Sequence, residues 1–188
     1  MQRELVERAM TGDHEAFAEL ASLSITRLFN VARLILRDDG RAEDATQDAL
    51  VTAWRDLSAL RDPDRFEAWL HRLLVRACYR EARRGRQRWA IEVATRSPMN
   101  IGRVAEPDVA RELADRDELE RGFRRLDPDQ RVVLVLHHYL GLSLDETGAV
   151  LGIPPGTARS RLSRATAAMR AALEADARTP LITNGRTT

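Results

Sequence analysis

The side chains best suited to chemistry lie near the C-terminal end of the chain, in residues 154–170. This segment holds four arginines and no acidic residue, which gives it a net charge of +4. A planar guanidinium donates two hydrogen bonds to a phosphate or to the edge of a guanine, and a serine hydroxyl contacts either a phosphate or a base. Recognition of duplex DNA is therefore the chemistry that these residues indicate.

Helical spacing separates this segment into two faces. The inward stripe, with an apolar residue every three or four positions, consists of Ala158, Leu162, Ala165 and Met169. The side left for DNA carries Arg159, Ser160, Ser163 and Arg164. A solvated, arginine-rich helix of an ordinary helical bundle is the alternative that spacing alone leaves open.

A short helix and a tight turn precede the basic helix. Ser143 and Glu146 have the spacing of a capping box, which starts a helix, and Gly152 is placed to end it. Pro154 and Pro155 then open the basic helix at once. A short helix, a glycine-containing turn and a basic second helix form the layout of a DNA-binding helix-turn-helix.

A second basic segment spans residues 72–96, where eight arginines face two glutamates for a net charge of +6. Aromatic residues in and around it are Phe66, Trp69, Tyr79 and Trp89. Single-stranded nucleic acid stacks its bases on such rings while arginines follow its backbone. Phe66 and Trp69 also have core spacing, so packing is the competing interpretation for these two.

Residues 38–67 are acidic, with nine acids against four arginines and a net charge of −5. Asp44, Gln47 and Asp48 form a ridge on a predicted helix, and the two carboxylates lie one turn apart. No histidine or third acid at ligand spacing joins them on that helix, which argues against a metal or acid–base site. Two interpretations of this ridge remain: a surface that docks on another protein, or a plain solvated helix face.

The other candidate groups argue against catalysis. His137 and His138 are adjacent and point about 100° apart on a helix, and the chain has no HExxH, no glycine-rich phosphate loop and no GxSxG. Cys78 is the one cysteine, so a disulfide framework is excluded, and we interpret it as structural. We predict no enzymatic activity, no metal and no cofactor.

Composition bounds the class of protein. The 188 residues are 44% hydrophobic and 31% charged, which favours a folded chain, and no run of about 18 apolar residues occurs. All 30 cations are arginine. The charged start of the chain does not have the pattern of a secretory signal. We expect a soluble protein of the reducing cytoplasm.

Helix signals dominate, so we predict an all-α fold. Asp13 caps a first long helix, for which the sequence Asp38-Asp39-Gly40 is the expected exit. The next helix is expected over residues 41–57, with Leu50, Trp54 and Leu57 facing the core.

A polar turn over residues 58–63 comes next. Asp64 and Glu67 then have capping-box spacing and predict the start of a helix that continues to Gly85 or beyond. Helical periodicity fails over residues 94–109 and resumes near Ala110, and Asp127 caps a further helix that ends at Gly141. We therefore expect two small helical domains, residues 1–93 and 110–178, joined by a flexible linker, residues 94–109, and followed by a disordered tail, residues 179–188.

Three motifs, in this order, resemble the extracytoplasmic-function (ECF, group IV) RNA polymerase sigma factors. Residues 43–50, EDATQDAL, are similar to the signature that docks on the clamp helices of the polymerase β′ subunit. Residues 66–70, FEAWL, with the arginine run that follows, resemble the segment that melts and reads the minus-ten element. Residues 144–165 resemble the helix-turn-helix that reads the minus-thirty-five element.

The resemblance implies a role for individual residues of this chain. A sigma region 2 domain would occupy residues 1–93 and a sigma region 4 domain residues 110–178. Polymerase binding falls to Asp44, Gln47, Asp48 and Arg55. Minus-ten recognition falls to Ser58, Arg61, Asp62, Arg76, Tyr79, Arg80, Arg83 and Arg84. The turn over residues 58–63 would capture a flipped-out base of the non-template strand, and minus-thirty-five recognition falls to Thr157, Arg159, Ser160, Ser163 and Arg164.

The same resemblance implies partners. These are core RNA polymerase, through its β′ clamp helices and β flap, promoter DNA, and an anti-sigma factor, with no direct membrane insertion and with nucleoid association when active. Arg76 and Arg80 stand where the family usually has Asn and Asp, so the promoter sequence does not follow from the chain. Gly148 stands where a small alanine is usual, which costs about 1 kcal/mol of helix propensity and still permits close packing.

Two other functions fit parts of the pattern. A free-standing helix-turn-helix regulator would bind duplex DNA tightly and sequence-specifically without polymerase. A helical adaptor or small helical enzyme with incidental basic faces would show no promoter dependence.

Overall fold

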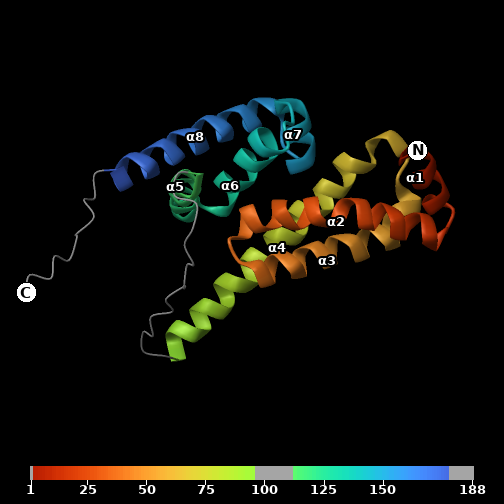
Figure 1. The fold of residues 1–188 in the computed structure, drawn as a ribbon, viewed down its shortest axis with the longest axis horizontal. Helices are drawn as coiled ribbons and strands as arrows, with labels where there is room; N and C mark the ends of the chain where they lie inside the picture. Colours follow the sequence, from red (N-terminus) through yellow and green to blue (C-terminus); the bar gives the residue numbers. More distant parts are fainter. Residues whose placement is uncertain (1, 96–111, 178–188) are drawn as a thin grey trace, which may run out of the picture.

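The computed structural model describes residues 2–95 and 112–177, and the side chains of residues 2–84 and 119–175. Two groups of helices follow one another along the chain (Figure 1). The first group comprises α1 (Gln2–Met10), α2 (His14–Leu36), α3 (Asp39–Asp56) and α4 (Phe66–Thr95), with short 3₁₀ turns at Leu57–Ala59 and Pro63–Arg65. The second comprises α5 (Glu112–Arg125), α6 (Pro128–Leu134), α7 (Leu144–Leu151) and α8 (Pro155–Ala177). The described residues contain no strand, which confirms the predicted all-α class.

Helix α3 packs between α2 and α4 through alanines. Its fully buried apolar side chains are Ala42, Ala45, Ala49 and Ala53. Of the predicted core residues, Leu57 is fully buried, whereas Leu50 and Trp54 are only half-buried, so the prediction is confirmed for Leu57 and the centre of the core face lies on the alanines instead. The prediction relied on large apolar residues, but α2 and α4 approach α3 so closely that its central contact face has room only for methyl groups.

The entry to α2 follows the prediction and its exit does not. The Asp13 carboxylate accepts hydrogen bonds from the amides of Glu15 and Ala16. The helix ends at Arg37, which adopts the left-handed conformation with φ of 60°, and Asp38 already caps α3. Gly40 therefore lies inside α3 rather than at the exit, because Asp38 has a side chain that can cap the next helix and the chain turns one step earlier.

The start of α4 also differs from the prediction. The Asp62 carboxylate accepts from the amide of Asp64 and begins a 3₁₀ turn, so α4 starts at Phe66. Asp64 and Glu67 do not form a capping box, because both are engaged by α1. Arg3 donates to Asp64 at 2.7 Å and Gln2 donates to Glu67 at 2.6 Å.

Capping in the second group follows the prediction. Asp127 with Gln130, and Ser143 with Glu146, form capping boxes at α6 and α7. Gly152 ends α7 with φ of 69°, and Gly141 with φ of 70° follows α6. Between the end of α6 and Gly141, Val135–Tyr139 form a π-helical turn, which the sequence did not predict.

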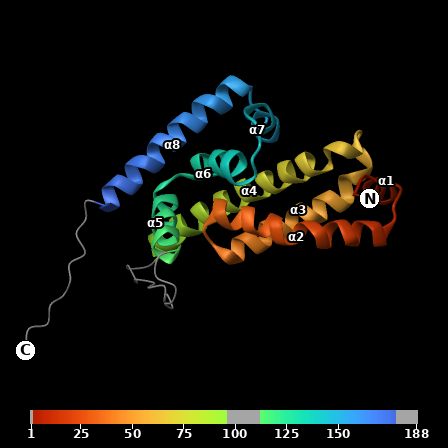
Figure 2. The ribbon, with the colours of Figure 1, turned by 45° about the horizontal axis from the view of Figure 1, so that its top comes forward.

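The two groups share one hydrophobic core. Val132, Val135, Leu136 and Val150 belong to the same buried cluster as the core residues of α1 to α4. Helix α6 contacts α2 and α4, and α7 contacts α4. Figure 2 shows α6 and α7 beside α4. A smaller cluster, containing Leu126, Val133 and Ala165, joins α5 and α6 to α8.

The expected linker and tail mostly lie outside the described residues. Ala94 and Thr95 belong to α4, and residues 96–109 and 179–188 are not described. No described helix is both long and apolar enough to cross a membrane.

Candidate functional site

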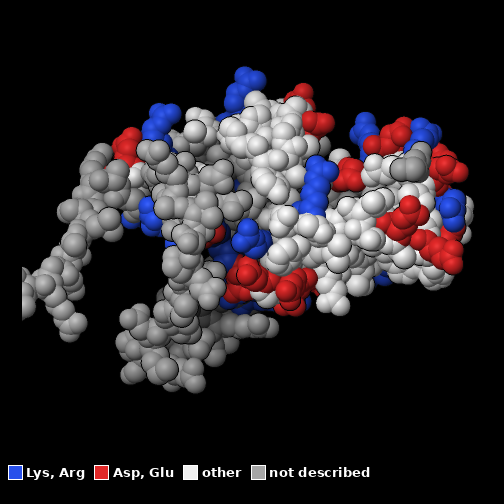
Figure 3. All heavy atoms as spheres, viewed as in Figure 1, with Lys and Arg blue, Asp and Glu red and all other residues white. Residues whose placement is uncertain are grey.

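Helix α8 presents the predicted DNA face to solvent. Arg159, Ser160, Ser163 and Arg164 are all exposed, whereas Ala158 and Ala165 on the opposite side are fully buried. The Ser160 hydroxyl donates to the Thr157 carbonyl at 3.0 Å, and Thr157 itself is half-buried. Figure 3 shows arginines along the upper edge of the molecule over α8 and a group of acids near the turn between α2 and α3, and acids also stand on the upper edge and at the α1 end.

The turn between α7 and α8 explains why residue 148 is a glycine. A Cβ atom at Gly148 would lie 2.7 Å from the Ile153 carbonyl oxygen. The Ile153 amide in turn donates to the Gly148 carbonyl at 2.9 Å, which holds the backbone there. From the sequence we interpreted Gly148 as a tolerated departure from alanine. The structure shows that a larger residue at this position would clash with the backbone of Ile153.

A hollow of about 240 Å³ lies beside the predicted DNA face of α8. Its lining combines acids and arginines: Asp127, Asp129, Gln130, Arg161 and Arg164. Arg164 therefore stands between the exposed face and an acidic recess of α6.

An apolar groove between α2 and α3 is the second surface feature. It has a volume of about 560 Å³ and is lined by Ile25, Thr26, Phe29, Glu43, Thr46, Gln47, Leu50 and Val51. Val51 is 58% exposed and Ile25 47% exposed, which is unusual for large apolar side chains. The sequence prediction missed the residues of α2, although Ile25 and the 67% exposed Leu23 lie off the core stripe of that helix and could have signalled it.

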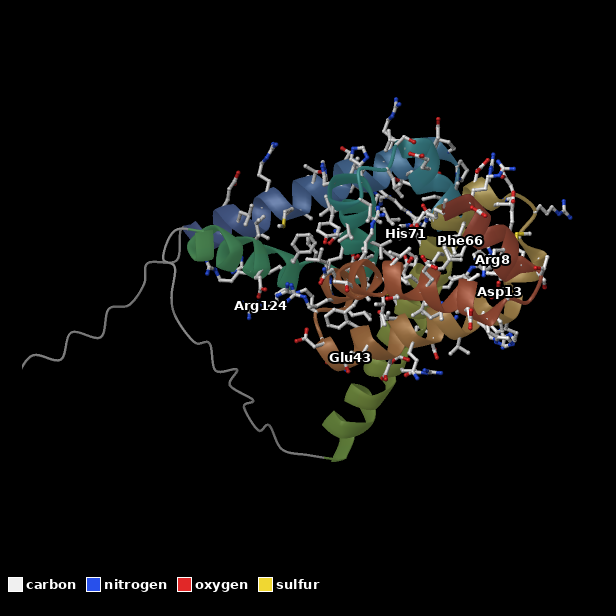
Figure 4. All side chains as sticks on the ribbon, turned by 45° about the vertical axis from the view of Figure 1, so that its right-hand side comes forward. Arg8, Asp13, Glu43, Phe66, His71 and Arg124 are labelled. Atoms are coloured by element: carbon white, nitrogen blue, oxygen red, sulfur yellow. The ribbon has the colours of Figure 1, made fainter. Side chains whose placement is uncertain are left out.

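The predicted polymerase-binding residues fall in different surroundings. Gln47 lines the groove and Asp44 is exposed beside it. Asp48 forms an ion pair with Arg80 of α4 at 3.6 Å, and Arg55 pairs with its neighbour Asp56 at 3.1 Å. Figure 4 shows Glu43 at the end of the α2–α3 pair, far from Arg8 and Asp13 at the other end.

Helix α4 exposes all four of its predicted DNA-binding arginines. Arg76, Arg80, Arg83 and Arg84 are exposed, and Arg84 also pairs with the buried Glu81. Phe66 is buried and lies 6.1 Å from the half-buried Trp69, measured between ring centroids, so both rings pack. The side chain of Trp89 lies outside the described residues.

Tyr79 lies apart from these arginines. It is half-buried and packs against the shared core. Burial, and next the nearby Asp129 carboxylate of α6, raise the pKa of Tyr79. The predicted minus-ten residue Tyr79 is therefore close enough to the second helical group for Asp129 to affect it electrostatically.

The turn predicted to capture a base is anchored on both sides. Leu60 is buried, and its amide donates to the Leu57 carbonyl at 3.0 Å. Ser58, Arg61 and Asp62 are exposed. Helix α1 holds the far side of the turn through the Arg3–Asp64 pair at 2.7 Å.

Metal and nucleophile chemistry find little support in the part of the chain that the structure describes. There, no three His, Cys, Asp or Glu side chains lie close enough to hold a metal ion. Cys78 is buried, which raises the pKa of its thiol to about 12 and keeps it protonated. The Nδ1 of His137 hydrogen-bonds the Leu142 carbonyl at 2.7 Å, so this ring contacts the backbone at the end of the π-helical turn.

Comparison with known proteins gives two family matches. Residues 9–89 match the family described as Sigma-70 region 2, and residues 116–169 match Sigma-70, region 4. The first match covers α2, α3 and most of α4, and the second covers the helix-turn-helix.

Relatives match over most of the chain. The chain is 32% identical over 164 residues to the ECF RNA polymerase sigma factor SigM of Mycobacterium tuberculosis, covering 87% of this chain and 80% of SigM. It is 35% identical over 184 residues to the RNA polymerase sigma factor CnrH of Cupriavidus metallidurans, covering 93% and 95% of the two chains. The structure resembles that of the sigma factor RpoE in complex with the anti-sigma factor NepR from Bartonella quintana. The TM-score is 0.68 and the identity 25%, over 85% of this chain and 98% of RpoE.

Proposed function

Because this chain belongs to the extracytoplasmic-function family of RNA polymerase sigma factors, we propose that it binds core RNA polymerase and directs initiation at promoters through their minus-thirty-five and minus-ten elements. Its relatives carry the names of sigma factors, which select promoters, rather than of enzymes. In this proposal, the polymerase catalyses RNA synthesis, and this chain positions the polymerase at the promoter.

The groove between α2 and α3 is the proposed polymerase-docking surface. Its apolar lining suits the apolar face of a partner helix, and Glu43 and Gln47 at its edge suit cations and amides of that helix. The exposed Asp44 extends the acidic edge. The β′ clamp helices are the partner that these features fit, and the β flap would meet the second helical group.

Helix α8 and the arginines of α4 are the proposed DNA surfaces. On α8, the exposed Arg159, Ser160, Ser163 and Arg164 would read the minus-thirty-five duplex, each good bidentate arginine contact discriminating by about 1 to 3 kcal/mol. Arg76, Arg80 and Arg83 would follow the minus-ten strand. The exposed residues of the turn over 58–63 would trap an unpaired base.

The family matches support the proposed division of the chain. Region 2, matched over residues 9–89, falls within the proposed domain 1–93, and region 4, matched over residues 116–169, falls within 110–178. We place the protein in the cytoplasm, on the nucleoid when active. An anti-sigma factor is its proposed regulator, since the structurally similar RpoE is bound by one.

One observation carries the proposal: two exposed surfaces of opposite character lie on different helices. The groove of α2 and α3 is apolar with acidic edges, and the outer face of α8 over residues 155–170 carries arginines and serines without an acid. DNA repels the first and attracts the second. Such a chain can hold a protein and DNA at the same time.

The test is run-off transcription with purified bacterial core polymerase on DNA from upstream of the chain's own gene. Wild-type protein is expected to produce a discrete start site that is absent without it. Asp44→Arg, which leaves the Asp48–Arg80 pair in place, is expected to weaken polymerase binding about tenfold or more, and the double variant Asp44→Arg/Asp48→Arg to abolish the transcript.

Glu15 and Glu19 provide the matched control, since they are also exposed acids one turn apart, on α2. The double variant Glu15→Arg/Glu19→Arg changes the net charge equally and is expected to keep transcription. Unaltered transcription by Asp44→Arg/Asp48→Arg would refute the docking assignment. Tight, sequence-specific DNA binding by the protein alone, without any binding to core polymerase, would favour the free-standing regulator.

A further inference from the structure

Helix α1 packs behind the turn that is proposed to capture a base. It contacts the 3₁₀ turns at both ends of this segment. Leu60 of the turn is buried in the same hydrophobic core as Val6, which is fully buried on α1. Burial of Leu60 fixes the middle of the turn and leaves Ser58, Arg61 and Asp62 exposed.

Two side chains of α1 bind the acids that follow the turn. The Arg3 guanidinium donates to the Asp64 carboxylate at 2.7 Å, and the Gln2 amide donates to the Glu67 carboxylate at 2.6 Å. Arg27 of α2 lies 3.9 Å from the other carboxylate oxygen of Glu67. The end of the turn and the first residues of α4 are therefore tied to α1 and α2.

Helix α1 is itself fixed to α2 at its other end. The Arg8 guanidinium donates to the Asp13 carboxylate through two nitrogens, at 2.6 and 2.9 Å. The Asp13 amide donates to the Arg8 carbonyl at 3.2 Å. Figure 4 shows Arg8 and Asp13 at the same end of the molecule as Phe66, the first residue of α4. Because α1 is anchored there, it can hold the turn in one place.

The same contacts affect the charge that the turn presents. Asp64 and Glu67 are two acids beside a segment that is proposed to approach a DNA strand, and the phosphates of DNA repel acids. Arg3 and Arg27 pair with these acids from the protein side. The exposed Arg61 of the turn is then the charge best placed to meet a phosphate.

We propose that Gln2 and Arg3 are positioning residues for base capture. Their contacts with Glu67 and Asp64, which we name the α1 brace, hold the turn in the conformation that accepts an unpaired base. The region 2 family match begins at residue 9, so it does not include either residue. The role in base capture rests on the proposed function, whereas the brace is a property of the isolated protein.

The first arm of the test measures amide hydrogen exchange in the isolated protein by NMR. The Arg65 amide donates to the Asp62 carbonyl at 3.0 Å, so its protection factor reports opening of the end of the turn. Arg3→Gln is expected to lower this protection factor about threefold, the size of effect that an exposed ion pair supports. Arg3→Gln/Asp64→Asn is expected to lower it no further, because both changes remove the same contact.

Arg33→Gln is the matched control, because it removes the same charge from an exposed position near the far end of α2. It is expected to leave the protection factor of Arg65 unchanged. Equal protection in Arg3→Gln and wild type, or an equal loss in the control, would overturn the brace. Circular dichroism checks that each variant is folded.

The second arm measures base discrimination by run-off transcription with core polymerase. The templates carry each of the four bases in turn at every position of the minus-ten element. Wild-type protein is expected to prefer one base at the captured position, and Arg3→Gln to reduce this preference about threefold while binding core polymerase as tightly. Arg3→Lys, which keeps the charge, is expected to restore most of the preference.

The outcomes separate positioning from a general structural role. An equal loss of transcript on every template, or an unchanged base preference in Arg3→Gln, would overturn the positioning role. Wild-type protein that gives no promoter-specific transcript would contradict the proposed function, and the role in base capture with it. The protection factors of the first arm decide in either case whether the brace exists.

Discussion

Two glycines of the helix-turn-helix are predicted to respond in opposite ways to the same mutation. Gly148 is buried in α7, where a Cβ atom would lie 2.7 Å from the Ile153 carbonyl oxygen. Gly156 is exposed in the first turn of α8, and a Cβ atom there would meet nothing within 4 Å. Neither glycine has a positive φ, so alanine is permitted by the backbone at both positions.

The magnitudes follow from these contacts. In a helix, alanine is favoured over glycine by about 1 kcal/mol, and this gain applies at both sites. At Gly148 it is opposed by overpacking against a hydrogen-bonded backbone carbonyl, which costs about 1 to 3 kcal/mol. We expect Gly148→Ala to lower the free energy of unfolding by about 1 kcal/mol and Gly156→Ala to raise it by about 0.5 to 1 kcal/mol.

Urea unfolding followed by circular dichroism measures both changes against wild type. A shift of the midpoint at constant slope identifies a change in stability rather than in the compactness of the denatured state. If Gly148→Ala proves as stable as Gly156→Ala, the close approach of α7 to the following turn does not constrain residue 148, and the steric reason given for this glycine is wrong.

Two further predictions concern buried titratable groups. Burial, followed by the charge of Arg27, lowers the pKa of His71 against an opposing effect of Glu67, so the unfolded chain binds the proton more readily. The contribution of His71 to the free energy of unfolding is then fully present above about pH 6.5 and is lost as the pH drops toward the lowered pKa. In urea unfolding, wild type is expected to lose more stability between pH 7.5 and 5.5 than His71→Gln. Equal losses in the two proteins would contradict this. Cys78, with its pKa raised to about 12 by burial, is expected to resist a thiol-reactive disulfide reagent at pH 8 in the native state and to react fully in guanidinium; rapid labelling of native protein would show that the thiol is accessible.

The caps were the part of the fold most reliably read from the sequence. Asp13, Asp127 and Ser143 cap the helices that they were predicted to cap, because a capping side chain acts within three residues of itself. The predicted start of α4 was wrong because the predicted cap, Asp64, is bound by a residue that is distant in the sequence. Asp64 had the right spacing for a cap, but α1, more than fifty residues away along the chain, offered it an arginine.

The proposed docking surface could not be fully predicted from the sequence. The acidic ridge of α3 was visible, but the groove also needs Ile25 and Phe29 of α2, and only the packing of the two helices brings them to Glu43 and Gln47. Tyr79 shows the same limit on α4. Arg76, Arg80 and Arg83 around it on the helix are exposed, whereas Tyr79 is half-buried and lies close enough to Asp129 of the second helical group for that carboxylate to raise its pKa.

The alanine face of α3 has a consequence for protein engineering. The position of α3 is set by the packing of its buried alanines, Ala42, Ala45, Ala49 and Ala53. The groove beside α3 is lined by Leu50 and Val51. Apart from Leu50, which packs against the core, and the buried Thr46, the α3 side chains offered to a partner thus differ from those that set the position of the helix. Exchanging the other groove residues is therefore a route to variants with altered partner choice that keep the parent scaffold.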